Sequence, residues 1–486
     1  MSSAAIDSTT SATPDPHRWQ ALGLVCIAFF MSILDVSIVN VALPSIGRSL
    51  HFSETGLQWV VTAYAITFGG FLLLGGRAAD LLGRRRVFVA GLLLFGLASL
   101  VGGLSSSQAM LVVARGFQGL GGAIVAPATL SILTTTFDEG IERNHALAAW
   151  GAMGAAGGAT GNFLGGVLTE LLGWEWILFI NVPIGVIAAV AALRIVPESR
   201  RVVVERHFDV SGALAVTAGL VILTFAIVRT DVNGWLSAST LLVAGAGIAL
   251  LVAFVGIERR ARRPLVPLRI FASRTLTTAN LVVLLMGSSA FAMWYFVSLY
   301  LQQVLGYSPI EAGLAFVPMT LTIIVSSTFA GRMAARLGPG RILAGGMALI
   351  ALGMALFARI SPTGTYLDDV LLPSILAAAG IGCSFVPVTI TATTGVARED
   401  AGLASGLVNT SRQVGGSIGL AVLATLATQR TAELAHAGGI SPAALTAGFH
   451  RAFLVGAGFA LVGALLAGGV LVPAQRGAPA PAPADA

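Results

Sequence analysis

Residues 19–41, WQALGLVCIAFFMSILDVSIVNV, decide the fold class of this chain. As an α-helix, an apolar run of this length can cross the roughly 30 Å hydrocarbon core of a bilayer. The run is longer than the core of a signal peptide, which spans about 7–15 residues, and it lacks a convincing small-residue cleavage site. We therefore expect a retained first membrane span that contains one carboxylate, Asp35.

Similar apolar runs repeat along the 486 residues of the chain. Hydrophobic residues make up 56% of the sequence and charged residues 10%, whereas a soluble domain has about 25% charged residues. This composition excludes a soluble globular protein and predicts an all-α polytopic membrane protein. The fourteen expected spans lie near 19–41, 56–76, 87–104, 109–134, 145–169, 175–195, 210–229, 236–257, 277–301, 310–331, 341–360, 369–395, 402–427 and 449–472.

The 28 basic residues are all arginines, and their distribution predicts the orientation. If the N-terminus is cytoplasmic, the loops on that side carry 21 arginines and the opposite loops carry five. Because cytoplasmic loops are enriched in positive charge, we expect both termini in the cytoplasm of a bacterial cell, with the chain in the inner membrane. The net charge of +6 is then explained by an anionic inner leaflet and needs no nucleic acid partner.

Several function classes are excluded by missing residues. The sequence has no lysine, so it carries neither a P-loop motor nor a Schiff-base lysine. Its two cysteines, Cys26 and Cys383, lie far apart in apolar runs and form no metal or redox motif, and its six histidines show no HExxH spacing. The loops are too short for a soluble catalytic domain. We therefore expect no enzyme activity and no cofactor.

An internal repeat with a constant offset of 255 residues organises the chain. The offset carries Gly76 onto Gly331 and Gly83 onto Gly338, so that the second span matches the tenth. Each half then contains six spans, with two additional helices between the halves. Two parallel halves of this kind are a transporter architecture, with the substrate site at their interface near the bilayer midplane.

The repeat predicts five regions in the chain. We expect a cytoplasmic N-terminal tail at 1–18, an N-terminal six-helix bundle at 19–195, two linker transmembrane helices with flanking cytoplasmic loops at 196–276, a C-terminal six-helix bundle at 277–472 and a disordered Ala/Pro-rich tail at 473–486.

Two motifs resemble a known family. Residues 76–86, GRAADLLGRRR, resemble the loop between the second and third helices of the major facilitator superfamily. Residues 34–44, LDVSIVNVALP, together with the fourteen spans, resemble its drug:proton antiporters of the EmrB/QacA type. The resemblance covers residues 19–472 and extends to 111–121, 302–318 and 410–416. It implies the major facilitator fold and proton-driven export.

Asp35 and Arg115 are the expected proton-coupling residues. Counted along their helices, both fall at similar depth, and a charged residue inside a span is a functional candidate by default. Burial favours a protonated carboxyl, whereas a nearby guanidinium favours the carboxylate, so a change in their separation would move a proton. In the family, the resemblance implies this coupling role for both positions. The alternatives are a static pair that orients helices and direct binding of a cationic substrate by Asp35.

Two further motifs predict helix movements. Gly76, Asp80, Gly83 and Arg84 are expected to form a conformational latch on the cytoplasmic side, although the arginines of this loop also serve as topology signals. Gly157, Gly161 and Gly165 follow the small-xxx-small spacing that lets helices approach closely, and they resemble the antiporter motif of drug exporters. Asn162 stands where that motif usually has proline, and generic helix packing is the alternative.

The substrate-binding candidates are aromatic and polar residues within the spans. Phe291, Trp294 and Tyr295 lie at i, i+3 and i+4, where they offer stacking and cation–π surface to flat molecules, or a patch for lipid or helix packing. Arg412 is expected at mid-depth, either to bind an anionic group or to bond carbonyls as a structural arginine. Further candidates of the same kind are Asn40, Gln58 and Tyr64.

We therefore predict a proton-coupled exporter of amphipathic drug-like compounds that works by alternating access. Its expected partners are the small-molecule substrate, protons and membrane lipids, and we expect a monomer. A dedicated exporter of one endogenous metabolite, such as an antibiotic or siderophore, is the near alternative. A membrane sensor that does not transport is a more distant one.

Overall fold

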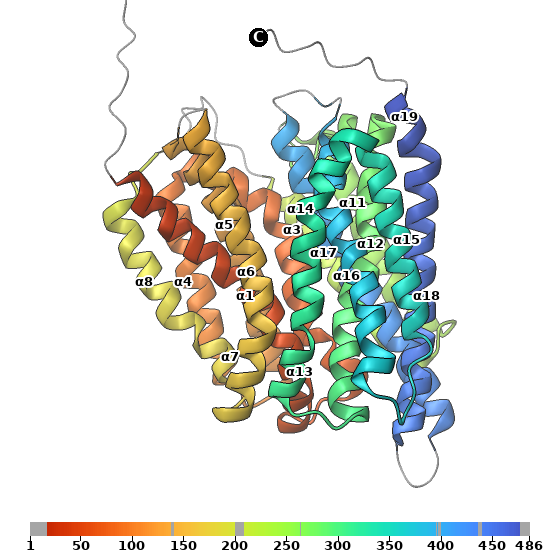
Figure 1. Cartoon of the computed structure of the whole chain (residues 1–486). Helices are drawn as coiled ribbons and strands as arrows, with labels where there is room; N and C mark the ends of the chain where they lie inside the picture. Colours follow the sequence, from red (N-terminus) through yellow and green to blue (C-terminus); the bar gives the residue numbers. More distant parts are fainter. Residues whose placement is uncertain are drawn as a thin grey trace, which may run out of the picture.

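The computed structural model describes residues 17–137, 140–199, 209–262, 264–394, 396, 400–435 and 440–476. Within these ranges the chain is helical and contains no β-strand (Figure 1). Most of the two expected tails, residues 1–16 and 477–486, lies outside the described residues.

Among the described residues, the N-terminal part of the chain forms eight helices and the central part three. The first eight are α1 (Arg18–Ser49), α2 (Glu54–Leu57), α3 (Trp59–Leu82), α4 (Arg84–Gly103), α5 (Gln108–Thr136), α6 (Ile141–Leu171), α7 (Trp176–Phe179) and α8 (Asn181–Ile195). The next three are α9 (Val210–Val228), α10 (Thr230–Asn233) and α11 (Ala238–Arg260). Helix α9 packs against α11 and also against α3 and α17.

The C-terminal part begins with a short 3₁₀ turn, η1 (Leu268–Ala272). The helices that follow are α12 (Arg274–Leu299), α13 (Pro309–Ala315), α14 (Val317–Leu337), α15 (Pro339–Phe357), α16 (Leu372–Thr393), α17 (Ala401–Leu434), α18 (Pro442–Leu466) and α19 (Val472–Arg476). Three π-helical turns, η2 (Tyr300–Val304), η3 (Tyr366–Leu371) and η5 (Ala467–Leu471), extend α12, α16 and α18.

Twelve helices in the described ranges are long and apolar enough to cross a membrane. The expected number of fourteen is therefore not supported. The segments expected near 145–169 and 402–427 do form long helices, α6 with 31 residues and α17 with 34. Glycines in α6, and polar residues in α17 such as Asn409, Arg412 and Gln413 on the cavity described below, lower the hydropathy of these two helices.

The offset of 255 residues reappears in the helix geometry. Ser53 caps α2 and Ser308 caps α13, each by accepting a backbone N–H bond of the first turn. Gly83 ends α3 with φ 112°, and Gly338 ends α14 with φ 88°. Positive φ is unfavourable for residues with a Cβ, so glycine makes the sharp turn between paired helices possible in both halves.

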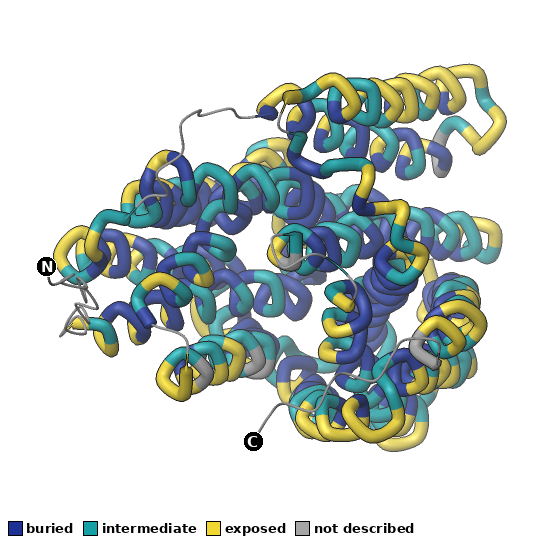
Figure 2. Tube along the Cα trace, turned by 90° about the horizontal axis from the view of Figure 1, so that it is seen from above, coloured by how far each residue is buried: buried dark blue, intermediate teal, exposed yellow. Residues whose placement is uncertain are grey.

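Two large apolar clusters are buried among the helices. One lies mainly among α1, α4, α5 and α8. The larger one lies mainly among α12, α15, α16 and α18 and continues onto the second part of α1, from Ile38 to Ile46. Figure 1 shows α4 and α8 on one side and α15 and α18 on the other, with α7 and α13 at the end opposite α19. Viewed from above, exposed residues follow the outer rim of the molecule (Figure 2). Many of the exposed residues are large and apolar, including Leu97, Ile187 and Leu465, as a lipid-facing surface requires.

Candidate functional site

A buried ion pair joins α1 and α5. Arg115 Nη1 lies 2.6 Å from Asp35 Oδ2, and the two side chains are 2% and 0% exposed. Asp35 Oδ1 also accepts hydrogen bonds from Gln118 Nε2 at 2.6 Å and from Asn181 Nδ2 at 2.9 Å. The carboxylate is thus held by three side-chain donors, so its charge is compensated inside the protein.

Arg115 is held on its other sides as well. Its Nε donates to the Val60 carbonyl at 2.9 Å, and its Nη1 also donates to Gln118 Oε1 at 2.6 Å. The guanidinium lies 4.6 Å from the centroid of the Tyr64 ring. Gln118 in turn donates to Ser99 Oγ at 2.8 Å. Five helices, α1, α3, α4, α5 and α8, therefore meet at this pair.

The structure brings Asp35 and Arg115 together, in agreement with their similar expected depth. Sequence reasoning did not assign Gln118, Asn181 or Ser99 to this cluster. The available signal was an amide or hydroxyl inside an apolar span, which costs free energy unless it is bonded. Many spans contain such residues, so this signal alone does not identify which ones share a cluster.

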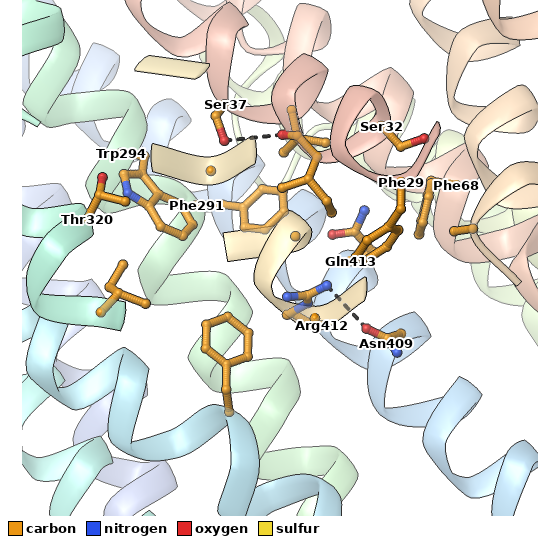
Figure 3. A pocket seen from close by; sticks show the side chains of 18 of the residues that line it. Phe29, Ser32, Ser37, Phe68, Phe291, Trp294, Thr320, Asn409, Arg412 and Gln413 are labelled. Carbon is orange, nitrogen blue, oxygen red and sulfur yellow. Dashed lines mark hydrogen bonds between the residues drawn. The ribbon is translucent and has the colours of Figure 1, made fainter. Parts of the chain in front are cut away.

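A cavity of about 550 Å³ lies between the two halves of the molecule (Figure 3). Its described lining comes from α1, α3, α5 and α6 in the first half and from α12, α14, α16 and α17 in the second. The walls are mainly aromatic and apolar, with several amides and hydroxyls between them. The lining includes Phe29, Ser32, Ser37, Asn40, Tyr64, Phe68, Trp150, Asn162, Phe291, Trp294, Thr320, Phe385, Asn409, Arg412 and Gln413.

Five of the seven predicted binding residues line this cavity, namely Asn40, Tyr64, Phe291, Trp294 and Arg412. Tyr295 does not line it, because its position one residue further along α12 turns it away. It is 1% exposed, packs edge-on against Phe296 and donates to the Glu54 carbonyl at 3.3 Å. Gln58 is fully buried and also lies outside the lining.

The glycine seam of α6 packs against α1. A Cβ on Gly157, Gly161 or Gly165 would approach an α1 backbone oxygen to 2.9 Å or less, closer than real Cβ atoms come. At Gly161 the same Cβ would also lie 2.6 Å from the Cβ of Ser37, two residues after Asp35. The predicted close approach therefore occurs, along the stretch of α1 that carries Asp35. Helix α6 continues through Asn162, which lines the cavity.

The predicted latch residues connect helices of the first half. Arg84 Nη2 lies 3.0 Å from Asp80 Oδ1, and Arg84 Nε donates to Ser131 Oγ on α5 at 2.6 Å. The same arginine bonds to Ser199 after α8, through its backbone N–H at 2.9 Å and its Nη1 at 3.3 Å. The positive φ of Gly83 allows the turn, and a Cβ on Gly83 would clash with Glu198. Gly76 lies against Pro127 of α5.

Metal-binding geometry is not found in the described ranges, which contain no group of three His, Cys, Asp or Glu side chains that could hold an ion.

The amino-acid sequence of this chain matches a protein family and resembles several named proteins. A profile of the Major Facilitator Superfamily matches residues 25–420. The puromycin resistance protein pur8 of Streptomyces alboniger is 40% identical over 97% of this chain and 94% of its own length. The cephamycin export protein CmcT of Amycolatopsis lactamdurans is 42% identical over 92% of this chain and 91% of its own.

Solved structures share the fold at low sequence identity. An auto-inhibited peptide transporter of the POT family matches with a TM-score of 0.69 and 16% identity, over 96% of this chain and 99% of that one. A bacterial homologue of the human lysosomal transporter Spinster, solved in an inward-facing conformation, matches with a TM-score of 0.67 and 15% identity, over 96% and 99%. At these identities the likeness concerns the fold alone.

Proposed function

This chain belongs to the major facilitator superfamily, and we propose that it is a proton-driven exporter of amphipathic, antibiotic-like compounds. Two relatives that cover more than nine-tenths of the chain are named for puromycin resistance and cephamycin export. The protein is a transporter rather than an enzyme. Its finer assignment is to the fourteen-spanner drug:proton antiporters of the EmrB/QacA type.

In this assignment α6 and α17 also cross the membrane, which brings the number of spans to fourteen. Their lengths of 31 and 34 residues are sufficient. Each packs along a membrane-spanning neighbour, α6 on α1 and α17 on α12. A span that presents polar residues to a cavity can be less apolar than one that faces lipid on all sides. The two six-helix bundles are then 19–195 and 277–472, with α9 and α11 between them.

The arginine distribution supports a cytoplasmic location for both termini in a bacterial inner membrane. Helices α7 and α13 then lie at the extracellular end (Figure 1). Near that end the halves are joined by hydrogen bonds from Ser298 Oγ to the Asn40 carbonyl at 2.6 Å and from Gln302 Nε2 to the Val41 carbonyl at 2.9 Å. These bonds support a closed extracellular side in this conformation, and alternating access requires that they break.

Asp35 is the proposed proton carrier and Arg115 its partner. The observation that carries this proposal is their 2.6 Å contact in a fully buried cluster beside the cavity. A proton on Asp35 would remove the charge that holds Arg115, and would so free α1, α5 and α8 to move relative to one another. When the pair re-forms in the other conformation, the proton leaves.

Tyr64 is the proposed link between cargo and proton. Its ring lies against the Arg115 guanidinium, and the same side chain lines the cavity. Cargo that displaces this ring would change the environment of the ion pair. This gives a physical route by which cargo binding and protonation of Asp35 affect each other.

The test is uptake into proteoliposomes with an acidic lumen, using labelled puromycin, cefoxitin and lincomycin as cargo. Empty liposomes control for passive trapping of weak bases. We expect wild-type protein to accumulate at least one compound, and Asp35→Asn to accumulate none while it still exchanges labelled for unlabelled cargo without a gradient. Equal accumulation by Asp35→Asn, or accumulation by wild type that ignores the gradient, would contradict the proposal.

A dedicated exporter of one metabolite is the second candidate, because one relative is named for the export of a single antibiotic class. The same panel separates the two. Gradient-driven uptake of compounds with unrelated scaffolds supports a multidrug exporter, whereas uptake of one scaffold supports the dedicated exporter.

A further inference from the structure

The described lining of the cavity carries positive charge and no negative charge. Among the described residues that line it, the single charged side chain is Arg412, and no lining residue is a carboxylate. The other polar groups are neutral. They are the amides of Asn40, Asn162, Asn409 and Gln413, the hydroxyls of serines, Thr320 and Tyr64, and the indole N–H groups of Trp150 and Trp294. The cavity therefore presents a positive charge in aromatic surroundings.

The nearby carboxylate is not available to neutralise a cationic cargo. Asp35 is 0% exposed and is absent from the cavity lining. Its two oxygens already accept bonds from Arg115, Gln118 and Asn181. A cation in the cavity would have to break these bonds to reach it, and it would also lie in the field of Arg412.

Arg412 is oriented but incompletely bonded. Its Nη2 donates to Asn409 Oδ1 at 3.2 Å, and its guanidinium lies 5.3 Å from the centroid of the Phe385 ring. Its Nε is buried and has no hydrogen-bond partner. Figure 3 shows Arg412 beside Asn409, with Phe291 near it in the same view. A buried donor without a partner is unfavourable, so a rotation of the guanidinium that brings this N–H to an acceptor on the cargo would gain free energy.

We propose that the cavity binds amphipathic cargo through an anionic group, with Arg412 as the anchor and the aromatic walls holding the apolar body. A guanidinium matches a carboxylate in shape and can donate to both of its oxygens. Phe29, Phe68, Trp150, Phe291, Trp294 and Phe385 supply flat apolar surface. A volume of about 550 Å³ lies within the range of roughly 300–1,000 Å³ found for pockets that hold drug-sized ligands. This inference names the cargo class of the proposed exporter and rests on that function.

The test is equilibrium dialysis at pH 7.5 with protein in nanodiscs, and empty nanodiscs control for partition into lipid. Three probes share one body: 4-(1-pyrenyl)butanoate, its primary amide, and 4-(1-pyrenyl)butylammonium. We expect wild-type protein to bind the carboxylate about tenfold more tightly than either of the others, as a charge-assisted bond predicts. Arg412→Gln is expected to bind the carboxylate and the amide equally.

Two further variants keep this result interpretable. Arg412→Lys retains the charge and is expected to keep part of the preference, and Arg48→Gln removes an exposed arginine outside the cavity and is expected to keep all of it. Thermal melting of each variant reports whether it is folded. Binding of the ammonium probe as tight as that of the carboxylate, an unchanged preference in folded Arg412→Gln, or no binding of any probe by wild type would overturn the inference.

The outcome is separable from that of the proton-coupling proposal. Binding in nanodiscs needs no gradient, so the carboxylate preference of the wild-type protein is measured independently of proton coupling. Wild-type protein that shows the carboxylate preference but no gradient-driven uptake would refute only the proton-driven function. Gradient-driven uptake without any preference would refute only the anionic cargo.

Discussion

Replacing Asp35 with asparagine is predicted to destabilise the protein, mainly because Arg115 then remains buried without its charged partner. Asparagine keeps the shape of Asp35 but removes the charge that compensates Arg115, which is 2% exposed. Arg115 would retain two neutral acceptors, the Val60 carbonyl and Gln118 Oε1. Removing one partner of a buried ion pair costs about 3–5 kcal/mol. We expect the lower part of this range, because these acceptors remain.

The reverse change is predicted to cost less. In Arg115→Gln, Asp35 keeps its bonds from Gln118 and Asn181, at 2.6 and 2.9 Å. The double variant contains no buried charge at this site, so it should be more stable than the sum of the two single changes implies. We expect a coupling energy of about 2 kcal/mol or more, within the range of roughly 0.5–3 kcal/mol seen for residues in contact.

The assay is reversible unfolding of the four proteins in mixed micelles of dodecyl maltoside and increasing SDS, followed by circular dichroism. Asp35→Glu serves as a control that retains the charge but not the length. Additivity of the two single changes within about 0.5 kcal/mol would refute the reasoning, because independent sites behave in that way. A smaller cost for Asp35→Asn than for Arg115→Gln would also contradict it.

Three further predictions concern residues around this pair. Tyr64→Phe should retain gradient-driven transport, because phenylalanine keeps the ring that contacts Arg115 and lines the cavity. Tyr64→Ala should lose most of this transport, measured as uptake at equal amounts of protein. Gly161→Ala should destabilise the protein by about 1–3 kcal/mol, because the added Cβ overpacks against α1. The matched control is Gly158→Ala, whose Cβ would lie 3.9 Å from its nearest neighbour. In the same unfolding assay this control should be about as stable as the wild type. Asp80→Asn should change the free energy of unfolding by less than about 1 kcal/mol, because the ion pair with Arg84 is partly exposed. The same variant should transport more slowly, because the proposed latch loses this ion pair. Transport at the wild-type rate would contradict the latch role.

The sequence predicts those features of the fold that depend on local patterns. Long apolar runs located most spans, and the 255-residue offset matched Gly83 with Gly338, which share a positive φ at equivalent turns. The expected count of fourteen spans is not supported, because glycine and polar residues lower the hydropathy of α6 and α17, and twelve helices in the described ranges are apolar and long enough to cross a membrane.

The candidate site was only partly predictable, because the sequence does not show which side chains of different helices pack together. Asp35 and Arg115 stood out as charges inside spans, and their pairing followed from depth. Asn181 reaches Asp35 from a helix 146 positions away in sequence, so only the packing of α1 against α8 reveals the contact. Tyr295 shares a helical face with Phe291 by spacing, but it lies toward Glu54 and Phe296 instead of the cavity.

The most direct test of the central claim, that Asp35 couples cargo export to protons, is the lumenal pH of proteoliposomes when cargo is added outside. A pH-sensitive dye in the lumen reports the exchange, with no pH gradient imposed beforehand. We predict that cargo entry drives protons out, so the lumen becomes alkaline with wild-type protein and stays unchanged with Asp35→Asn. Alkalinisation of equal size in Asp35→Asn, or cargo entry by wild type without any change in lumenal pH, would contradict the claim.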